Sequence, residues 1–444
     1  MIDITKKNGI ICVFNRQANT LMTTHSKKAL SLIDLYTEKK PFAEVLTGIT
    51  QRPQGSLPHI PDIDNVTSNV DNRVQYIKKY TGIDPEYLQG LREEKTPEHY
   101  KGNIENYIGL TKIPTGIAGP LYINGTAAQG DFWVPLATTE GALVASYNRG
   151  AKATRLCGGI TSVCTTEGIQ RTPVWKFATL AEVGQFIHWL LQQTDKLKAI
   201  VKENSRYAVL EELKLNMEGN HVLTLFEYTC GEAAGQNMIT ICTEAICKYV
   251  EDNSPVKPAS WYIESNYSGD KKATAVSFSS VRGKKVTTEA VVYKDVVADV
   301  LKTTPQAIAD YWQASVVSAI QSGSIGMQGH IANGLSALFL ACGQDVACVS
   351  EAYVGITRME VTNAGDLYVS ITLPSLVVGT VGGGTSLPTQ QECLQILQCT
   401  GKGSARKFAE ICGALALAGE LSIAAAIASG QFGKAHKLFR RKSK

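Results

Sequence analysis

The chain lacks paired cysteines, a recognisable leader and long apolar runs. None of its eleven cysteines forms a CxxC pair, and most lie within apolar stretches. We therefore expect small buried thiols in a reducing compartment, and no metal site. The first residues hold no apolar segment long enough for a signal peptide, and no uninterrupted apolar run reaches the ~18 residues that span a membrane. A cytoplasmic protein that does not enter a membrane is the expectation.

An excess of charge of one sign is also missing. The 444 residues include 44 Lys and Arg against 40 Asp and Glu, a formal charge of +4. This excess is too small to argue for a nucleic-acid partner. Basic residues gather only in residues 434–444, a tail that is either solvated or placed to neutralise a phosphorylated ligand. The hydrophobic fraction of 44% is that of a soluble globular protein, and the length allows two or three domains.

The dinucleotide fingerprint GxGxxG is absent, but another glycine loop is present. Residues 173–263 have the pattern of an inserted α/β module, which opens with a predicted capping box of Thr179 and Glu182. Two predicted strands follow, and the loop GEAAGQN (residues 231–237) then leads into an amphipathic helix. A strand, a glycine loop and a helix in this order present free N–H groups to a phosphate.

One carboxylate stands out in residues 131–151, DFWVPLATTEGALVASYNRGA. Glu140 lies in an otherwise uncharged run that begins as a strand and continues as an apolar helix. Because burial of an unpaired ionised carboxylate is costly, Glu140 is either paired or kept protonated for proton transfer. The simpler alternative is that Thr138 or Thr139 caps the helix and Glu140 favours its positive end.

Further polar residues are candidates for the same site. Lys271 and Lys272 open a predicted strand, so they point to opposite faces, and one of them can be buried against a carboxylate such as Glu140. Asp345 lies within residues 323–349, which predict a helix hydrophobic nearly all round, the pattern of a central buried helix. Asp345 is then either part of a C-cap turn or a second buried acid.

Assembled in chain order, eight motifs resemble the 3-hydroxy-3-methylglutaryl-coenzyme A reductase family. They are ENYIG, IPTGIAGPL, PLATTEGALVAS, the GQNM loop, GDKKATA, ACGQD, GTVGGGTSLPTQQ and the final AH, and they cover about three quarters of the chain. The ATTEG form is similar to the class I enzymes, which use NADPH. The resemblance implies a soluble enzyme without the membrane anchor of eukaryotic members. Its reaction would reduce 3-hydroxy-3-methylglutaryl-coenzyme A to mevalonate and coenzyme A through two hydride transfers.

The resemblance also implies an α+β architecture. A large, mainly helical domain (residues 101–172 and 264–444) surrounds one central buried helix. A small ferredoxin-like α/β domain that binds NADPH (residues 173–263) is inserted into it. Residues 1–100 form an N-terminal arm or small helical domain, and residues 432–444 form a C-terminal flap. Active sites lie at the interface of a homodimer or of a dimer of dimers.

Four residues match the catalytic positions of the family. Lys271 would polarise the thioester carbonyl and stabilise the developing oxyanion. Glu140 would donate a proton near that oxygen, which requires burial and a neighbouring acid to raise its pKa from about 4.3. Asp345 would be that neighbour, hydrogen-bonded to both. His436 would protonate the leaving thiolate, a task that suits an ordinary pKa of about 6.5, although a lone histidine in a basic tail is most simply a surface residue.

Binding positions carry over from the resemblance in the same way. Arg206 and Arg441 would contact the extra phosphate that distinguishes NADPH from NADH. The positions that match substrate-binding ones are Ser146, Arg171, Asn266, Lys272 and Asn333. Those that match cofactor-binding ones are Ser205, Arg206, Tyr207, Asn237, Met238, Gly382, Gly383, Gly384 and Arg441.

Some positions depart from the family pattern. Ala314 stands where a lysine that meets a coenzyme A phosphate is expected, Glu264 stands in place of a serine, and Glu232 stands for Asp. These departures leave open a second hypothesis, a catalytically weakened homologue that binds coenzyme A thioesters as a sensor or scaffold. A thioesterase that uses a Cys or Glu with His is a third, although no nucleophile motif supports it.

Overall fold

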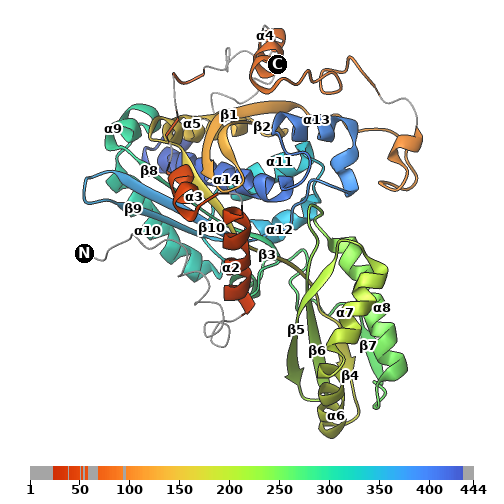
Figure 1. Cartoon of the computed structure of the whole chain (residues 1–444). Helices are drawn as coiled ribbons and strands as arrows, with labels where there is room; N and C mark the ends of the chain where they lie inside the picture. The colour runs from red at the N-terminus through yellow and green to blue at the C-terminus, as the bar shows by residue number, and fades with distance from the viewer. Residues whose placement is uncertain are drawn as a thin grey trace.

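The computed structural model describes residues 24–38, 40–50, 52–53, 56–58, 69–93 and 97–433 (Figure 1). His436 and Arg441 lie outside these residues. The helices are α2 (Thr24–Thr37), α3 (Phe42–Ile49), α4 (Val70–Thr81), α5 (Leu143–Leu156), α6 (Leu180–Leu191), α7 (Thr194–Asn204), α8 (Gln236–Asn253), α9 (Lys294–Val296), α10 (Pro305–Ser322), α11 (Ile331–Ala341), α12 (Val349–Ala352), α13 (Pro388–Ile396) and α14 (Ser404–Ala428). Shorter helical turns are η2 (Pro97–Tyr100), η3 (Ala275–Phe278), η4 (Val297–Leu301), η5 (Val346–Cys348) and η6 (Gly383–Ser386).

The strands form one continuous sheet within the described residues. They are β1 (Thr115–Gly125), β2 (Gln129–Ala137), β3 (Ile160–Arg171), β4 (Val174–Lys176), β5 (Val209–Glu218), β6 (His221–Thr229), β7 (Ser260–Tyr262), β8 (Gly283–Val292), β9 (Ile356–Val361) and β10 (Leu367–Leu376). The main order is β7-β4-β6-β3-β8-β10-β9, while β1 pairs with β2 and β3, and β5 pairs with β6. Only the β1–β3 pairing is parallel.

Strand β3 belongs to both halves of this sheet. From Thr161 to Gly168 it pairs with β8, and from Ile169 to Arg171 it pairs with β6. The chain therefore passes from the larger half to the smaller half without leaving the sheet, as Figure 1 shows.

The turn-rich segment before residue 131 forms a long hairpin. Strands β1 and β2 pair antiparallel from Thr115 opposite Ala137 to Asn124 opposite Gln129. The backbone N–H of Gly125 donates to the carbonyl of Ala128 at 2.7 Å and closes the turn. Neither Asn124 nor Gly125 has a left-handed backbone, but an added Cβ on Gly125 would lie 2.6 Å from the Ala128 carbonyl oxygen, so the turn requires glycine there. The hairpin that the Asn-Gly pair indicates is present.

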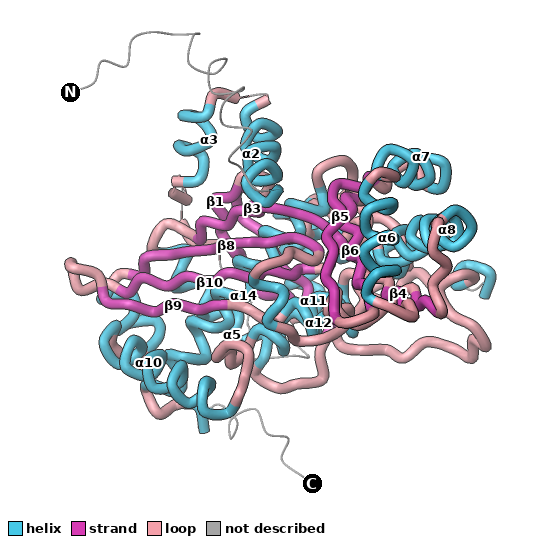
Figure 2. Tube along the Cα trace, turned by 90° about the horizontal axis from the view of Figure 1, so that it is seen from below, coloured by secondary structure: helices cyan, strands magenta, loops and turns pink. Residues whose placement is uncertain are grey.

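Helix α14 packs against the larger half of the sheet, on strands β3, β8 and β10, with α5, α10 and α11 around it. Figure 2 shows α2 and α3 on the opposite side, near β1 and β3. The Tyr36 hydroxyl of α2 donates to the carbonyl of Cys164 on β3 at 3.1 Å. The N-terminal helices therefore cover part of the sheet, over β1 and β3.

The central buried helix is α14, and not the one predicted within residues 323–349. That prediction gave too much length to α11, which runs for 11 residues, whereas α14 runs for 25 residues and is buried nearly throughout. Among the described helices, α14 alone is long and apolar enough to span a membrane, and 83% of its most apolar window is buried in the protein. The larger half also contains a sheet, because β1, β2, β3, β8, β9 and β10 lie within it beside the helices.

The smaller half follows the chain as strand, helices, two strands, helix and strand. Its strands lie in the order β7-β4-β6-β5, all antiparallel, and α6, α7 and α8 belong to the same segment. The predicted capping box is confirmed, because the Thr179 hydroxyl accepts the N–H of Glu182 and the Glu182 carboxylate accepts that of Thr179.

The TxxE spacing of Thr389 and Glu392 also matches a capping box, but the structure has no capping box there. Helix α13 begins at Pro388 without a side-chain cap. The Glu392 carboxylate instead accepts the backbone N–H groups of Tyr87 and Leu88. Glu392 therefore ties a turn of the N-terminal region to the larger half of the fold.

Candidate active site

Glu140 lies in an exposed turn ahead of α5. That helix begins only at Leu143, so neither Thr138 nor Thr139 is its cap. The Thr138 hydroxyl instead accepts the N–H of Glu140 at 3.0 Å, and the Glu140 carboxylate accepts a hydrogen bond from the Asn333 amide at 3.2 Å. The expected burial of Glu140 is not found in the single chain, because the turn faces outward and α5 is entered after it.

Ser146 lies next to a histidine that the sequence analysis missed. The Ser146 hydroxyl is 3.1 Å from the Ser422 hydroxyl and 3.1 Å from Nε2 of His330. The His330 ring stacks on Tyr147, whose hydroxyl donates to the His330 carbonyl at 2.7 Å. Burial, and secondarily the nearby Arg149 cation, lowers the pKa of His330 to about 4. A neutral imidazole therefore lies beside Ser146 at physiological pH.

Buried Glu420 fixes the start of α11. Its carboxylate accepts the backbone N–H groups of Gly329, His330 and Ile331. These N–H groups lie at the positive end of α11, where a carboxylate is favoured. The central helix thereby sets the position of both His330 and Asn333.

Lys271 and Asp345 form an ion pair, with Nζ 2.9 Å from Oδ2. Lys271 lies in a turn with a left-handed φ of 55°, so the predicted strand is wrong here and the chain continues into η3. Asp345 is neither a C-cap residue nor buried. It begins η5, where its carboxylate accepts the N–H of Ala347. The hydrogen bond to Asp345 raises the pKa of Lys271.

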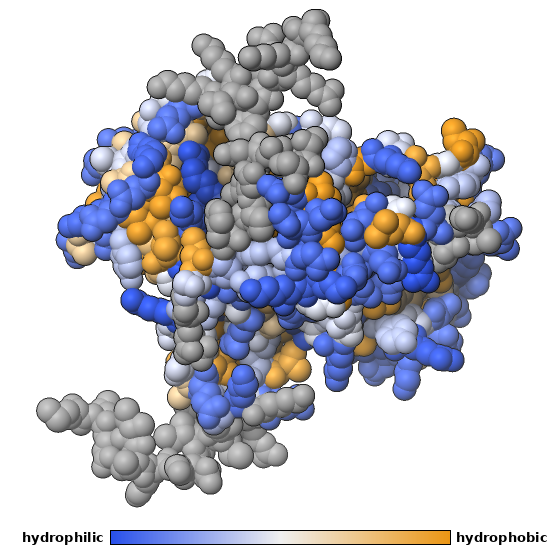
Figure 3. All heavy atoms as spheres, turned by 90° about the horizontal axis from the view of Figure 1, so that it is seen from above, coloured by the Kyte–Doolittle hydropathy of each residue, from blue (hydrophilic) through white to orange (hydrophobic). Residues whose placement is uncertain are grey.

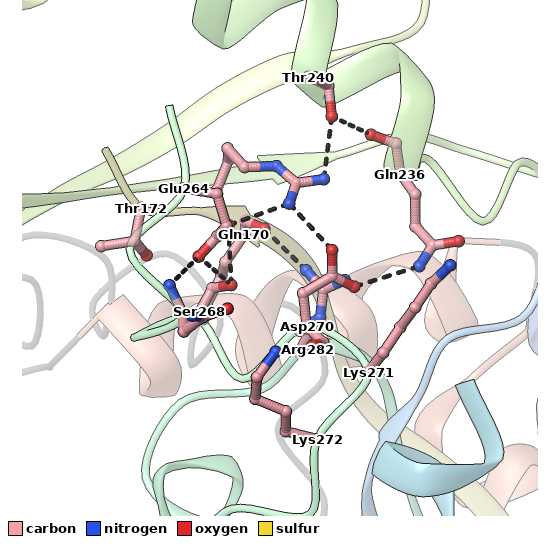
Figure 4. Close-up of polar contacts among 12 residues, drawn as sticks. Gln170, Thr172, Gln236, Thr240, Glu264, Ser268, Asp270, Lys271, Lys272 and Arg282 are labelled. Atoms are coloured by element: carbon pink, nitrogen blue, oxygen red, sulfur yellow. Dashed lines mark hydrogen bonds and ion pairs between the residues drawn. The ribbon is translucent and has the colours of Figure 1, made fainter. Parts of the chain in front are cut away.

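Arg171 is buried among residues of its own chain. Figure 4 labels three of them, Glu264, Asp270 and Thr240. Its guanidinium contacts Glu264 and Asp270, both at 2.9 Å, and donates to the Thr240 hydroxyl. Glu264 also accepts the N–H of Asn266 at 2.8 Å. A substrate that binds Arg171 as predicted would therefore compete with the carboxylates of Glu264 and Asp270, which already bind this arginine.

The remaining predicted residues of this loop face outward. Asn266 is exposed with a left-handed φ of 66°. Lys272 is exposed, and its ammonium donates to the carbonyl of Asp270 at 3.0 Å. Both side chains are therefore accessible to a ligand.

A second arginine, Arg282, was also missed. Its guanidinium binds Asp270 and Glu351 and donates to the Gln170 carbonyl. Although burial opposes the change, Arg282 and then Arg171 lower the pKa of Asp270. Arg282 and Glu351 are 2% and 3% exposed. A buried charged pair gives no local sequence pattern, because its partners are far apart in the chain.

Two glycine segments that are distant in sequence lie side by side. Ala233 of residues 231–237 forms a parallel bridge with Val381, and Thr380 donates to the carbonyl of Glu232 at 2.8 Å. A Cβ on Gly379 would lie 2.3 Å from the backbone nitrogen of Ala234, so this approach requires glycine.

The glycine segment of residues 379–384 also contacts the GQD motif, residues 343–345. The Gln344 side chain accepts the N–H of Gly379 at 2.9 Å. A Cβ on Gly343 would lie 2.3 Å from the carbonyl oxygen of Gly384. Gly382 and Gly383 begin η6 in left-handed conformations. Gly343, two residues before Asp345, is therefore packed against Gly384 of the predicted cofactor residues.

The start of α8 carries the other predicted cofactor positions. Gly235 is its left-handed N-cap, Asn237 is exposed in the first turn and Met238 packs against the core. Gln236, which was not predicted, lies 3.4 Å from Asp270 and 3.2 Å from the Cys348 sulfur. The N-terminus of α8 is thereby joined to the loop that carries Lys271.

The loop between α7 and β5 lies at the surface. Arg206 and Tyr207 are exposed there, and the Ser205 hydroxyl accepts the N–H groups of Tyr207 and Ala208. This turn presents both side chains to solvent.

The predicted site residues form two groups at opposite ends of α11. Glu140 binds Asn333 in its first turn, whereas Lys271 binds Asp345 beyond its last residue. An α-helix rises 1.5 Å per residue, so the 11-residue helix is about 16 Å long. Among the described residues, no hydrogen bond or ion pair joins Glu140 to Lys271 or Asp345.

Comparison with known proteins shows which family this chain matches. The family model of hydroxymethylglutaryl-coenzyme A reductase matches residues 69–441. The chain belongs to the hydroxymethylglutaryl-coenzyme A reductase family. A reductase of this name from Pyrococcus abyssi is 40% identical over 410 residues, covering 86% of this chain and 100% of that protein. One from Aeropyrum pernix is 43% identical over 396 residues, covering 87% and 94%.

The fold is also that of solved reductases. A class II 3-hydroxy-3-methylglutaryl-CoA reductase from Streptococcus pneumoniae, bound to NADPH in open conformations, superposes with a TM-score of 0.66 at 18% identity. The match covers 81% of this chain and 97% of the other. At this identity the similarity establishes the shared fold.

Proposed function

We propose that this reductase-family chain reduces 3-hydroxy-3-methylglutaryl-coenzyme A to mevalonate and coenzyme A with NADPH, in two successive steps. The observation that carries the proposal is the Lys271–Asp345 ion pair, whose GQD motif packs against the predicted cofactor glycines. The segment that binds the ammonium is thereby packed against the backbone of Gly384. The family membership and the names of the archaeal relatives support the same activity.

Each reacting group would have a separate role, either to stabilise charge or to transfer a proton. The Lys271 ammonium would lie against the substrate carbonyl and stabilise the negative charge that develops on its oxygen. Asp345 keeps that ammonium in place and charged. Glu140 would supply a proton near the same oxygen, and His436 would protonate the departing thiolate. NADPH, when bound, would supply the hydride.

The glycine segments and the helix N-terminus fit the phosphates of NADPH. The 18-residue helix α8 begins beside the point where the two segments meet, and a helix N-terminus favours an anion. The exposed Arg206 would bind the extra phosphate, together with Arg441. The other residues proposed to hold the cofactor are Ser205, Tyr207, Asn237, Met238, Gly382, Gly383 and Gly384.

The sheet supports a proposal for the domain division. We infer that residues 173–263 form an inserted ferredoxin-like, NADPH-binding domain, since the strand order β7-β4-β6-β5 is that of a βαββαβ unit. Residues 101–172 and 264–444 would form the substrate domain, with residues 432–444 as a flap, and residues 1–100 the arm. The ATTEG motif favours the class I form, and a cytoplasmic location is consistent with a buried α14.

A homodimer, or a dimer of dimers, would complete the site. The Glu140–Asn333 group of one copy and the Lys271–Asp345 group of its partner would meet at the interface, which would also bury Glu140. Apolar side chains are exposed on the α10 surface, where Val317 is 58% and Ile320 74% accessible. Figure 3 shows apolar patches among the hydrophilic residues of one face. The substrate would then contact Ser146, Asn266, Lys272, Asn333 and Arg171.

Spectrophotometry of the purified protein tests the activity. We expect about two NADPH oxidised per thioester consumed, because each hydride carries two of the four electrons. NADH should be a poorer donor if Arg206 binds the extra phosphate. An intact oligomer that oxidises no NADPH above background with this thioester contradicts the proposal.

One observation favours a second candidate, a coenzyme A thioester sensor. Arg171 is engaged by Glu264 and Asp270, and Ala314 on the exposed side of α10 offers no cation. Calorimetry that shows saturable thioester binding in the absence of any nicotinamide turnover would select it.

A further inference from the structure

Resting on the proposed function, we propose that Glu351, held by Arg282, is a positioning residue that fixes Lys271 for reaction. The Glu351 carboxylate uses its two oxygens for different partners. Oε1 accepts the backbone N–H of Lys271 at 2.6 Å, and Oε2 accepts Nε of Arg282 at 2.6 Å. Neither residue touches the reacting atoms, so both act through Lys271.

Lys271 needs such support because its backbone is strained. It lies in a turn with φ of 55°, a left-handed conformation that is unfavourable for a residue with a Cβ. Its side chain is 48% exposed, so little packing restrains it. The hydrogen bond to buried Glu351 holds this conformation, together with the arginine contacts of the preceding residue, Asp270. Figure 4 shows Asp270 between Arg282 and Lys271.

A single short segment controls both ends of Lys271. Asp345 and Glu351 lie six positions apart, on η5 and α12. Glu351 fixes the backbone of Lys271, and Asp345 fixes its ammonium. The direction of the side chain is therefore determined by one rigid piece of chain.

Arg282 connects the segment that carries Asp345 and Glu351 to the sheet. Besides Glu351 and Asp270, it donates to the carbonyl of Gln170 at 2.8 Å, on strand β3. Because the pair is almost completely buried, removal of one partner leaves an uncompensated charge and loosens the turn. The sheet is in this way connected to the position of the Lys271 ammonium.

Steady-state kinetics of Glu351→Gln and Glu351→Ala test the inference. Since misplacement of a reacting group by 1 Å can cost about 100-fold, we expect kcat to fall about 100-fold for the alanine variant. The glutamine variant should fall about 10-fold, because its amide oxygen still accepts the Lys271 N–H. The KM for NADPH should stay within about twofold of wild type, as neither residue is assigned to the cofactor.

Asp131→Asn provides the matched control, because it breaks a similar ion pair with buried Arg155 away from Lys271. It should lower the Tm and leave kcat near wild type. The inference is overturned if folded Glu351 variants keep kcat within about threefold of wild type, or lose no more than this control. If the alanine variant does not fold, the glutamine variant decides by the same limit.

Acetylation by acetic anhydride, followed by peptide mass spectrometry, measures how fast the Lys271 amine is labelled, independently of turnover. The Glu351 variants should label Lys271 several-fold faster than wild type, since its ammonium leaves Asp345. Lys248, paired with Glu244 at the same 2.9 Å, should label equally in all proteins. Unchanged labelling of Lys271 refutes the positioning role. A wild-type protein without reductase activity refutes the proposed function alone.

Discussion

At the scale of single residues, Arg171 shows how a binding role can depend on a neighbour. The resemblance assigned it to substrate, and the structure surrounds it with Glu264, Asp270 and Thr240. A substrate carboxylate must therefore displace or join carboxylates that are already hydrogen-bonded. The serine expected at position 264 would not compete in this way.

Glu264→Gln should improve substrate binding. The amide keeps the hydrogen bonds to the loop but removes one charge that competes for Arg171, so KM for the thioester should fall about three- to tenfold. Glu211→Gln on strand β5 changes the net charge equally at an exposed position and should leave KM unaltered. A KM that rises or stays constant in the first variant contradicts the competition.

His330 should make stability fall in mild acid. Its pKa is about 4 in the folded chain against about 6.5 when unfolded, so between these pH values only the unfolded chain takes up the proton. Stability is retained above pH ~6.5 and declines progressively by about 3 kcal/mol toward pH ~4. Denaturant titrations of wild type and His330→Gln should diverge over this window. Parallel pH profiles would contradict the assignment.

Sequence patterns found the charged residues of the site but not the contacts that hold them. Lys271 and Asp345 were both singled out, and they do form a pair. Their dependence on Arg282 and Glu351 was not foreseen, since these partners are 69 positions apart and each lies in an ordinary local setting. Exposure of Glu140 was equally hidden, because a run of uncharged neighbours does not show which way a turn faces.

At the scale of elements, α14 organises the larger half through close backbone contact. A Cβ added to Gly150 of α5 would lie 1.9 Å from the carbonyl oxygen of Ala418 on α14. The two helices therefore approach each other at a distance that no larger residue allows.

Gly150→Ala should destabilise the protein by about 2–3 kcal/mol, since the helices must separate within a packed core. Gly184→Ala on α6 is the matched control, because its added Cβ meets nothing within 4 Å. That change should be neutral or stabilise by up to about 1 kcal/mol, as alanine is the better helix former. Thermal unfolding of both variants separates these outcomes, and equal Tm values would show that the contact is not tight.

Elements with strong local signals were predicted well. The Ala-rich composition of residues 411–428 indicates a helix, and these residues lie within α14. The spacing of Thr179 and Glu182 predicts the capping box at the start of α6. The central helix was misplaced to residues 323–349 because hydrophobicity alone does not fix helix length. The TxxE at Thr389 misled for a related reason, since its glutamate is used in a tertiary contact instead.

At the scale of the whole molecule, the sheet in the larger half was not foreseen. Strands β8 and β10 are separated by 74 residues, which include helices α9 to α12 and strand β9, and their pairing is a long-range event. Local periodicity reports which face of a strand is buried, but it does not report the partner strand. The same holds for the candidate active site, because local sequence does not show whether the Glu140 group and the Lys271 group, at opposite ends of α11, meet within one chain or between two copies.

Mixing two inactive variants should restore activity if the site is shared between copies. Glu140→Gln and Lys271→Ala should each lose nearly all turnover. In a mixed population, heterodimers carry one fully intact site, so about a quarter of the wild-type activity should return after subunit exchange. Recovery should be absent for either variant mixed with itself. No recovery in the verified heterodimer would place both residues of a working site on the same copy.

Strand β3 has a mechanical consequence for the proposed cofactor domain. Its pairing changes from β8 to β6 between Gly168 and Ile169, with no unpaired linker between them. Any rotation of the smaller half must therefore twist a hydrogen-bonded ribbon instead of turning about a free joint. Such a coupling makes the angle between the halves stiff, and it transmits torque from the smaller half directly into the strands beneath α14.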